Sequence, residues 1–596
     1  MIPLVIESGS GPRTVDLLAY LEPDQEEQAQ EDAYRWIKAI RHLRVDGQPF
    51  RSRFTFRGDS LWWFAELYLH KEQAILNVLR ALAAFDTLVE RERPLAVTAS
   101  DGPYAGAVAH AAAARQVRYA GHGWPRGFTS SLIKMEARAS ALALAARLSR
   151  ERASSAPPGR ASIAAFVHRA FWKAEGTDGS AESYIGPVLR ELEARAPSRG
   201  VRYVGIGPRT NFRARRWWDG LKRGTDHAFV PIERYARPSA LAGARAIYRD
   251  RHRIRQSLWK SADLRAHAVI RGCDCWPLVR EQLAGIALLQ FPWSARAMDE
   301  AAAALEALQP DVAVTYAEAG GWGRALALEC RRRSVPLAGL QHGFIYRHWL
   351  NYRHEADETG PDPLNPADQG FPFPQVTLLF DRATAEHLLN AGRFPPATLQ
   401  ITGSARLDET LAAVQALSAE ERDHTRRETG ATEGRSLVLF AAKEKEARRS
   451  LPALVTAVRA MPDIVLVIKP HPAETAEVYA SAVAGAANVR VLDPSAPLAP
   501  LLASAQAIVT VNSTVAIDAL ALGIPSLVIG LPNNLTPFVE AGTMAGASTP
   551  DEIQPGLAQV LYDQEFRSSI RSRETTGDGC AARRSADAIA RLTGVK

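Results

Sequence analysis

Cysteine is scarce in this chain of 596 residues. Four cysteines occur, which is too few and too scattered for a disulfide scaffold of this size; they are Cys273, Cys275, Cys330 and Cys580. Cys273 and Cys275 stand too close together for ordinary zinc ligation, and no second Cys or His pair follows at a matching interval. We therefore expect a reducing compartment and no bound metal.

Signals for secretion and membrane insertion are also missing. The first residues contain no basic segment followed by an apolar core, and no stretch approaches the run of about 18 apolar residues that a spanning helix requires. Hydrophobic residues at 46% and charged residues at 23% are ordinary, which excludes a disordered or low-complexity chain. We expect a cytoplasmic protein with several globular domains, either soluble or peripheral to a membrane.

The positive charge is local. The chain carries a net +7, yet residues 209–260 alone hold fourteen Lys or Arg against four Asp or Glu, so that the remainder is slightly acidic. Ile247, Ile254 and Leu258 recur there at helical spacing between arginines, which would suit a helix lying on an anionic membrane. A solvated basic face or an interdomain surface is the alternative. No recognised nucleic-acid-binding module accompanies the charge, so we expect no nucleic-acid partner.

The chain repeats one local pattern from end to end. Short β-branched strands end in Gly, Ser, Asp or His and lead into Ala- and Leu-rich helices, which predicts an α/β fold with parallel sheets. The Ser- and Pro-rich segment 150–160 and the region 380–398 are the best linker candidates. We therefore divide the chain into an N-terminal α/β region, a middle domain, a C-terminal domain and a tail, at residues 1–150, 151–390, 391–575 and 576–596.

Two of these segments resemble each other. The strand Ala96–Thr98 and the strand Ala313–Thr315 are each followed by a Gly-containing turn, an Ala-rich helix, another strand and a His-Gly pair. The His-Gly pairs begin at His122 and His342. Residues 1–150 are thus either a degenerate copy of half a domain or simply another βα unit.

The sharpest local motif is Lys469-Pro470-His471-Pro472, directly after the apolar residues 464–468. Ligands bind at the carboxyl ends of strands in open parallel sheets, and two prolines hold the loop rigid there. Lys469 and His471 are therefore candidate ligands for a phosphate or a nucleotide base. A stiff loop with an incidental imidazole is the alternative.

Small hydroxyl side chains stand where two later helices begin. Ser513 and Thr514 close one strand and open a helix, so they would bind phosphate or act as plain N-caps. Arg406 lies in a similar loop, where it would reach a diphosphate or pair with Asp408. Lys443 follows the strand at 437–441.

The middle domain offers candidates for a general base. His342 follows the strand at 335–340 and precedes a glycine that allows close backbone approach. Glu318 follows the neighbouring strand and would orient that imidazole or act as the base itself. His168, with the aromatic and acidic residues at 171–182, follows an earlier strand.

In this order the motifs resemble those of a known family. They look like bacterial surface-polysaccharide glycosyltransferases of the GT-B fold, especially the capsule, Kdo and sialyl transferases with an HP motif and the CDP-glycerol glycerophosphotransferases. The motifs are Gln341-His342-Gly343, Gly403 to Asp408, Lys469 to Pro472, and Asn512-Ser513-Thr514 through Pro525. In the N-terminal region, Arg57-Gly58-Asp59-Ser60-Leu61-Trp62-Trp63 looks like a segment of surface carbohydrate biosynthesis proteins.

The resemblance implies two Rossmann-like domains that face a cleft, without a bound metal. The loop that begins at His168 would face this cleft and suit a sugar acceptor. Lys443 and Lys469 would stabilise the leaving phosphate, or each is a solvated surface lysine. His471 and Pro472 would contact a cytidine nucleotide, Ser513 and Thr514 its phosphate, and His342 would match the His-Gly base. The sialyltransferases place an acidic pair before glycine, whose nearest equivalent in the first region is Asp101. Asp101 and Glu318 therefore stay open as alternative bases.

We expect a metal-independent glycosyltransferase that moves a sugar from a nucleotide donor, by resemblance a CMP-sugar, to a bacterial surface polysaccharide such as capsule or lipopolysaccharide. The acceptor would be a glycan or a lipid-linked glycan, reached by peripheral membrane contact through residues 209–260. A CDP-polyol phosphotransferase and a non-catalytic scaffold of a polysaccharide assembly complex are alternatives. A nucleotide-sugar 2-epimerase is a weaker one, because the same fold serves it.

Overall fold

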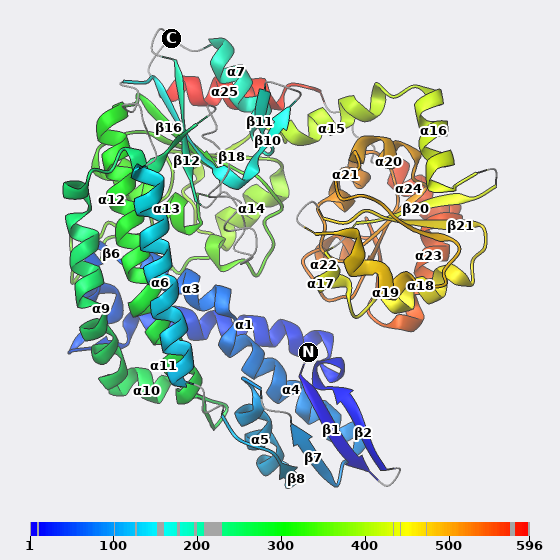
Figure 1. Cartoon of the computed structure of the whole chain (residues 1–596), viewed down its shortest axis with the longest axis horizontal. Helices are drawn as coiled ribbons and strands as arrows, with labels where there is room; N and C mark the ends of the chain where they lie inside the picture. Colours follow the sequence, from blue (N-terminus) through cyan, green and yellow to red (C-terminus); the bar gives the residue numbers. More distant parts are fainter. Residues whose placement is uncertain are drawn as a thin grey trace. The chain divides into compact units, whose positions relative to one another are not determined.

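The computed structural model divides the chain into two compact units (Figure 1). Unit 1 comprises Met1–His342, His348–Ile401 and Ser585–Lys596, and unit 2 comprises Gly343–Arg347 and Thr402–Arg584. The residues that the structure describes are 2–8, 11–99, 102–124, 128–151, 160–175, 179–195, 200–207, 229–316, 318–432, 434–441, 443–471, 474–572 and 578–593.

Unit 2 is built on a six-stranded parallel sheet. Its strands follow the order β22-β21-β20-β23-β24-β25 and are β20 (Ser436–Phe440), β21 (Ile464–Ile468), β22 (Val489–Val491), β23 (Ala507–Thr510), β24 (Ser526–Ile529) and β25 (Ala545–Ala547). In chain order this is 3-2-1-4-5-6, the order of Rossmann folds, and it reverses between β20 and β23. Such a reversal opens a ligand crevice at the carboxyl ends of those two strands.

Helices cover both faces of this sheet because β20 is apolar on both sides. Val438 and Phe440 face a core formed with α18 (Leu451–Arg459) and α23 (Ile553–Tyr562). Leu437 and Leu439 face the opposite core, formed with α20 (Leu498–Ser504) and α21 (Val515–Ala521). Figure 1 shows these helices on opposite sides of the sheet. Full burial on both faces explains the uninterrupted apolar runs of the sequence.

Unit 1 contains a second Rossmann-type sheet of seven strands. Its order is β13-β12-β9-β16-β17-β18-β19, all parallel, with β9 (Ile163–His168), β12 (Val201–Ile206), β13 (Val230–Pro231), β16 (Val312–Tyr316), β17 (Leu337–Leu340), β18 (Val376–Leu379) and β19 (Leu399–Ile401). Here the order reverses between β9 and β16. The predicted α/β class with two Rossmann-like sheets is confirmed.

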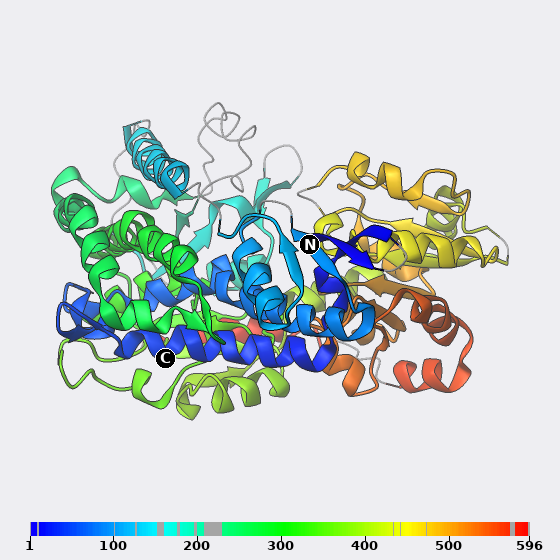
Figure 2. The ribbon, with the colours of Figure 1, turned by 90° about the horizontal axis from the view of Figure 1, so that it is seen from below.

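The N-terminal region has a small sheet of its own and a set of helices. The sheet order is β2-β1-β7-β8, with β1 (Pro3–Ser8), β2 (Gly11–Asp16), β7 (Ala96–Ala99) and β8 (Arg118–Ala120). The helices include α1 (Pro23–Ala39), α3 (Trp62–Glu72), α4 (Ala74–Glu92) and α5 (Ala105–Ala114). Figure 2 shows α1 as the long dark-blue helix that runs along unit 1. All of these elements belong to unit 1.

The internal similarity has a structural counterpart. β7, α5 and β8 form a βαβ unit with parallel strands, as do β16, α13 (Gly321–Arg332) and β17. Each is followed by its His-Gly pair. The two segments therefore share one local topology, and descent from a common half-domain stays a prediction.

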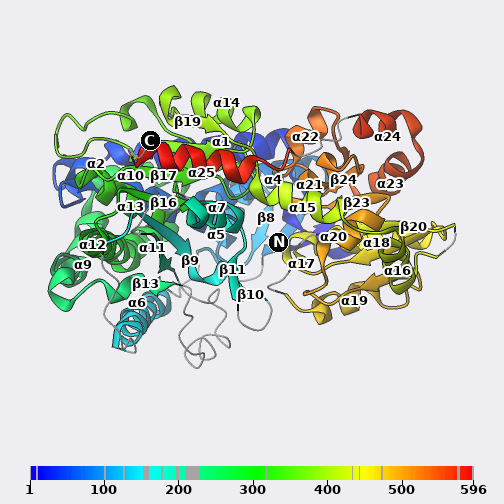
Figure 3. The same cartoon turned by 90° about the horizontal axis from the view of Figure 1, so that it is seen from above.

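The change from unit 1 to unit 2 falls between Ile401 and Thr402, so the predicted boundary at residue 390 lies within unit 1. The predicted tail 576–596 contains the helix α25 (Ala581–Leu592), which returns the chain to unit 1. There Asp587 pairs with Arg195 of α7 (Gly186–Arg195), and Figure 3 shows the two helices side by side.

The basic segment 209–260 is described from residue 229 onward, and its last part is the helix α9 (Ala242–Lys260). The apolar side of α9 is partly covered, since Leu258 is fully buried and the helix packs along α12 (Phe291–Leu308). Arg245, Arg249 and Arg253 are exposed. Contact of this basic face with a membrane stays a prediction. No helix among the described residues is both long and apolar enough to cross a membrane.

Candidate functional sites at the sheet edges

In unit 2, the loop after β21 presents the predicted Lys469 and His471. Nζ of Lys469 donates a hydrogen bond to the carbonyl oxygen of Pro494 at 3.1 Å, so this ammonium is anchored to the loop after β22. His471 is exposed at the carboxyl end of the sheet. Pro472 lies outside the described residues. The imidazole is therefore accessible to a ligand at the edge where Rossmann folds bind nucleotides.

The loop after β23 is held by its own hydroxyls. Thr510 Oγ1 donates to the carbonyl oxygen of Ala441 at 2.5 Å and accepts from the backbone N–H of Ser513 at 3.0 Å. The Ser513 hydroxyl accepts from the N–H of Val515 at 3.3 Å, whereas the Thr514 side chain makes no capping bond. Thr514 is the N-cap residue of α21, and the Ser513 hydroxyl satisfies the N–H of the first helical residue. Phosphate binding by Ser513 and Thr514 stays a prediction.

Lys443 follows β20, on the other side of the strand-order reversal. Its side chain is exposed and lies 3.8 Å from a carboxylate oxygen of Glu446, a loose surface pair. Lys443 and Ser513 therefore follow the two strands between which the crevice of unit 2 opens.

Arg406 has a different partner from the one that its local sequence suggests. Its guanidinium binds the carboxylate of Asp518 at 2.8 and 3.1 Å, and the Asp408 carboxylate instead accepts from the backbone N–H of Ala581. Of the two roles that the sequence left open for Arg406, pairing with Asp408 is not found, because the guanidinium at the start of α15 (Ala405–Gln415) binds Asp518 of α21 in the same unit instead. A diphosphate role for Arg406 stays a prediction.

In unit 1, His342 lies just beyond β17 against aromatic rings. Its ring centroid is 5.3 Å from that of Tyr316 and 5.7 Å from that of Tyr184. Burial lowers the pKa of His342 to about 4. The imidazole is therefore neutral near pH 7 and able to accept a proton.

Glu318 follows β16, the strand beside β17, and its side chain is buried with 3% exposure. The carboxylate lies over the backbone of Gly339, where a Cβ atom would come within 2.8 Å of Glu318 Cγ. Burial raises the pKa of Glu318 to about 7. Charge on Glu318 in turn raises the pKa of the buried Tyr352 phenol, after burial itself.

The two candidate bases have separate surroundings. Burial alone accounts for the lowered pKa of His342, and among the described residues no hydrogen bond joins it to Glu318. Each group would therefore have to act independently as a base. The third candidate, Asp101, lies outside the described residues.

The sequence analysis did not single out Tyr316, whose ring lies against that of His342. The Tyr316 hydroxyl accepts the backbone N–H of His168 at 2.9 Å and also interacts with the buried Glu182. Glu182 in turn accepts the N–H groups of Tyr184 at 2.8 Å and Ile185 at 2.5 Å. Glu182 and His168 belong to the loop expected to face an acceptor. The sequence feature that could have identified Tyr316 is its position at the carboxyl end of the strand β16.

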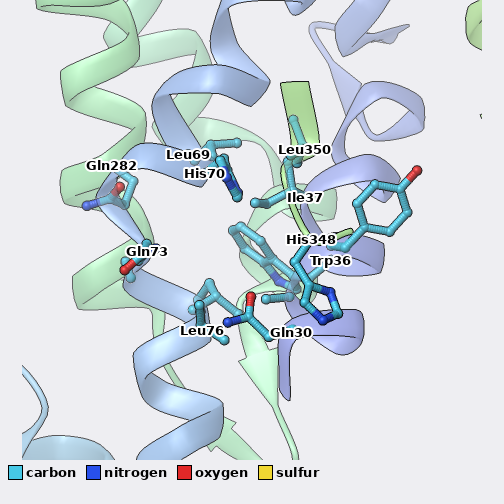
Figure 4. Close-up of a pocket in the computed structure, with 14 residues that line it drawn as sticks. Gln30, Trp36, Ile37, Leu69, His70, Gln73, Leu76, Gln282, His348 and Leu350 are labelled. Carbon is cyan, nitrogen blue, oxygen red and sulfur yellow. The ribbon is translucent and has the colours of Figure 1, made fainter. Parts of the chain in front are cut away.

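A small pocket lies elsewhere in unit 1, among α1, α3, α4 and α11 (Trp276–Gly285) (Figure 4). Trp36, His70, Gln73 and Gln282 are among its lining residues. Its accessible volume of about 20 Å³ holds roughly one water molecule, so it is no nucleotide site. The described residues contain no group of three or more His, Cys, Asp or Glu side chains placed to hold a metal.

Comparison with known proteins gives one family match, and it covers part of the chain. The model of a family described as UDP-N-acetylglucosamine 2-epimerase matches residues 375–590, which include nearly all of unit 2. No curated protein matches the chain. The family match concerns nucleotide-sugar enzymes and does not single out the Kdo and sialyl transferases.

Among solved structures, the UDP-GlcNAc 2-epimerase of Neisseria meningitidis bound to UDP-GlcNAc is 13% identical, covering 72% of this chain and 98% of its own, with a TM-score of 0.44. A putative UDP-N-acetylglucosamine 2-epimerase of Listeria monocytogenes is 16% identical, covering 73% and 98%, with a TM-score of 0.44. The wall teichoic acid polymerase TagF is 11% identical, covering 78% and 98%, with a TM-score of 0.39.

Proposed function

We propose that the chain is an enzyme acting on a nucleotide sugar, with glycosyl transfer to a bacterial surface polysaccharide as its reaction. The observation that carries this proposal is the match of residues 375–590 to a nucleotide-sugar enzyme family. It is supported by the Rossmann strand order of unit 2, with Lys443 and Ser513 after the strands that flank the reversal. The acceptor is a glycan or a lipid-linked glycan.

In this proposal unit 2 binds the nucleotide and unit 1 supplies the base. His471, Lys469 and the Ser513-Thr514 loop hold the donor. His342 or Glu318 removes the proton of an acceptor hydroxyl, whose oxygen forms a bond to the anomeric carbon of the donor sugar. The bond from that carbon to the phosphate oxygen breaks, and the nucleotide leaves with the bonding electron pair, stabilised by basic side chains.

A second candidate is epimerisation at carbon 2 of a UDP-linked amino sugar. The family match favours it directly, because that family is named for this reaction. The buried acid or base groups that glycosyl transfer requires would serve proton transfer in an epimerase equally well. On this alternative no acceptor is consumed and the nucleotide stays attached in the product.

Analysis of the products by proton NMR separates the two reactions. UDP-N-acetylglucosamine incubated with the protein alone would yield a second UDP-linked sugar if the chain is an epimerase. Glycosyl transfer requires an added acceptor and releases free nucleotide. Incubating CMP-, UDP- and GDP-sugars with the protein, each with and without an added surface glycan, identifies the donor. Inactivity with all of these sugars would contradict the proposal.

Two further proposals concern the product and the partner. A phosphodiester linkage detected by phosphorus NMR would establish the CDP-polyol phosphotransferase instead. Protein that binds no nucleotide but associates with polysaccharide assembly enzymes would establish the scaffold.

Peripheral membrane contact through the exposed arginines of α9 is tested by sedimentation with anionic vesicles and the charge-reversal variant Arg249→Glu.

A further inference from the structure

Residues 57–63, the segment RGDSLWW, have no place in the candidate sites, yet residues 59–63 are buried in unit 1. Trp62 and Trp63 are fully buried. The polar side chains of the segment bind residues far along the chain. Arg57 pairs with Asp299 at 2.6 Å and with Glu329 at 3.2 Å. Asp59 pairs with Arg331 at 3.1 Å and with Arg332, and the Trp62 indole N–H donates to Glu358 at 2.8 Å.

One turn beyond this segment, α3 places Glu66 in a buried ion-pair network. Glu66 accepts from Lys38 at 2.6 Å, and Lys38 also binds Glu358 at 2.7 Å. The other carboxylate oxygen of Glu66 pairs with Arg324 of α13. All four side chains are at most 3% exposed, and their formal charges balance. A balanced, fully paired network is the form in which buried charges are tolerated.

The buried guanidinium of Arg324 bridges this network to the β16–α13 loop. Nη1 donates to the carbonyl oxygen of Trp63 at 2.5 Å, Nη2 to that of Asn351 at 3.3 Å, and Nε to that of Ala319 at 2.9 Å. Ala319 is the residue after Glu318. Arg324 therefore ties the N-terminal segment directly to the loop that carries a candidate base.

The carbonyl oxygen of Ala319 accepts a hydrogen bond from a second side chain. The Asn351 side-chain amide donates to it at 3.3 Å, and the next residue, Tyr352, is the phenol that faces Glu318. The path from Glu66 to Glu318 is thus continuous, through Arg324 and the backbone of Ala319. Lysine could not replace Arg324 in this role, since one ammonium with three N–H groups cannot reach four acceptors, three carbonyl oxygens and the Glu66 carboxylate, arranged around a planar fork.

From these contacts we infer that residues 57–66 fix the position of Glu318, with Arg324 as the positioning residue that transmits their hold. The segment is then part of the machinery of unit 1 rather than an independent appendage. The inference rests on the proposed function only for the catalytic use of Glu318. The placement of the carboxylate is measurable without any activity.

The test follows the ionisation of Glu318 by carbon NMR in protein labelled at the glutamate carboxyl carbons, with the resonance assigned by its loss in Glu318→Gln. In Arg324→Lys the β16–α13 loop keeps the Asn351 amide bond at 3.3 Å but loses its guanidinium anchor, and water reaches the carboxylate. We expect the titration midpoint of Glu318 to fall by about one pH unit or more, toward the ordinary range of glutamate. Glu66→Gln, which weakens the same anchor while preserving volume, is expected to lower it by a smaller amount.

Arg51→Lys provides a matched control. Arg51 is buried in the same part of unit 1, binds Asp368 at 2.9 Å, and donates to the carbonyl oxygens of Asp357 and Gly360. None of these hydrogen bonds reaches the described part of the β16–α13 loop, although the Arg51 guanidinium also lies over the Trp63 ring, 4.9 Å from its centroid. The Glu318 midpoint should therefore fall clearly less in Arg51→Lys than in Arg324→Lys. An unchanged midpoint in both Arg324→Lys and Glu66→Gln, or an equal fall in Arg51→Lys, would overturn the inference. Retained activity in Glu318→Gln would instead contradict only the catalytic role.

Discussion

Arg406 and Asp518 form a two-pronged ion pair, with Nη2 2.8 Å from Oδ1 and Nη1 3.1 Å from Oδ2. The aspartate is 1% exposed, and burial raises the pKa of its carboxyl while Arg406 opposes that change. Because Asp518 lies on α21, the helix after Ser513 and Thr514, the pair holds the loop that is proposed to bind phosphate.

Replacement of Arg406 by alanine should therefore destabilise unit 2. It leaves a buried carboxylate without its counter-charge, which costs about 2 kcal/mol for a pair whose arginine is partly exposed and lowers the thermal midpoint by several degrees. The double variant Arg406→Ala with Asp518→Asn should recover part of that loss, since the unpaired charge is removed. Scanning calorimetry measures both. Unchanged stability together with weaker nucleotide binding would instead assign Arg406 to the diphosphate.

The pH dependence of activity distinguishes the two candidate bases. A general base acts only when deprotonated, so kcat/KM falls below its pKa. If His342 is the base, the acid limb lies near pH 4, because burial lowers its pKa to about that value. If Glu318 is the base, the limb lies near pH 7, because burial raises its pKa to about that value.

Substitution checks that assignment. Removal of the true base, by His342→Ala or Glu318→Gln, should reduce turnover by roughly 10²-fold or more while nucleotide binding is preserved. The variant of the other residue should keep the wild-type acid limb. Neither residue is the base if both variants turn over substrate at near wild-type rates.

Binding of the nucleotide should raise the thermal midpoint of the protein and depend on His471. A ligand that binds only the folded state at about 100 times its Kd stabilises it by about 2.7 kcal/mol. A panel of CMP, CDP, UDP, GDP and ADP distinguishes a cytidine donor, which the motif resemblance implies, from a uridine donor, which the family match suggests.

The matched control is His424→Ala, an exposed histidine of α16 (Ala419–Thr429) in the same unit. We expect His471→Ala to lose the response to the active nucleotide and His424→Ala to keep it. A response retained in His471→Ala would exclude the imidazole from the nucleotide site.

The sequence predicts those features that are local along the chain. Apolar runs such as residues 464–468 become buried strands, and the residues after them stand at the carboxyl edge of a sheet, so Lys469, His471 and His342 could be placed from pattern alone. Strand order follows less directly, yet the βα repeats already imply parallel sheets. That is why fold class and strand ends were predictable.

Partners brought together by tertiary packing were not predictable in this way. Asp518 is over a hundred residues from Arg406, and Glu66 lies still farther from Arg324, so no spacing in one sequence relates them. The apolar spacing on α9 is likewise interpreted as a membrane-facing surface, with a solvated or interdomain face as the alternative, and nothing in the sequence indicates that α9 packs along α12 of the same unit. Tyr316 was passed over because a tyrosine that ends a strand is, by itself, an ordinary core residue.

The buried side chain of His354 should make the stability of the folded protein sensitive to acid. Its ring is 2% exposed, lies 3.7 Å from the ring centroid of Phe371, and has no hydrogen-bond partner at either nitrogen among the described residues. Burial, followed by the charges of Lys38 and Arg324, holds its pKa well below the usual range. The folded chain therefore keeps this imidazole neutral at a pH where the unfolded chain protonates it.

The stability that depends on His354 is fully present above about pH 6.5, the pKa of an unfolded histidine, and is lost as the pH falls below that value. Each such group removes up to about 1.4 kcal/mol of unfolding free energy per pH unit. His354→Phe eliminates the group without breaking a hydrogen bond, so the thermal midpoint should fall less steeply between about pH 6.5 and pH 5 than in the wild type. His424→Phe, at an exposed position, controls for the loss of an imidazole and should keep the wild-type slope. An unchanged slope in His354→Phe would mean that protonation of His354 does not contribute to acid destabilisation.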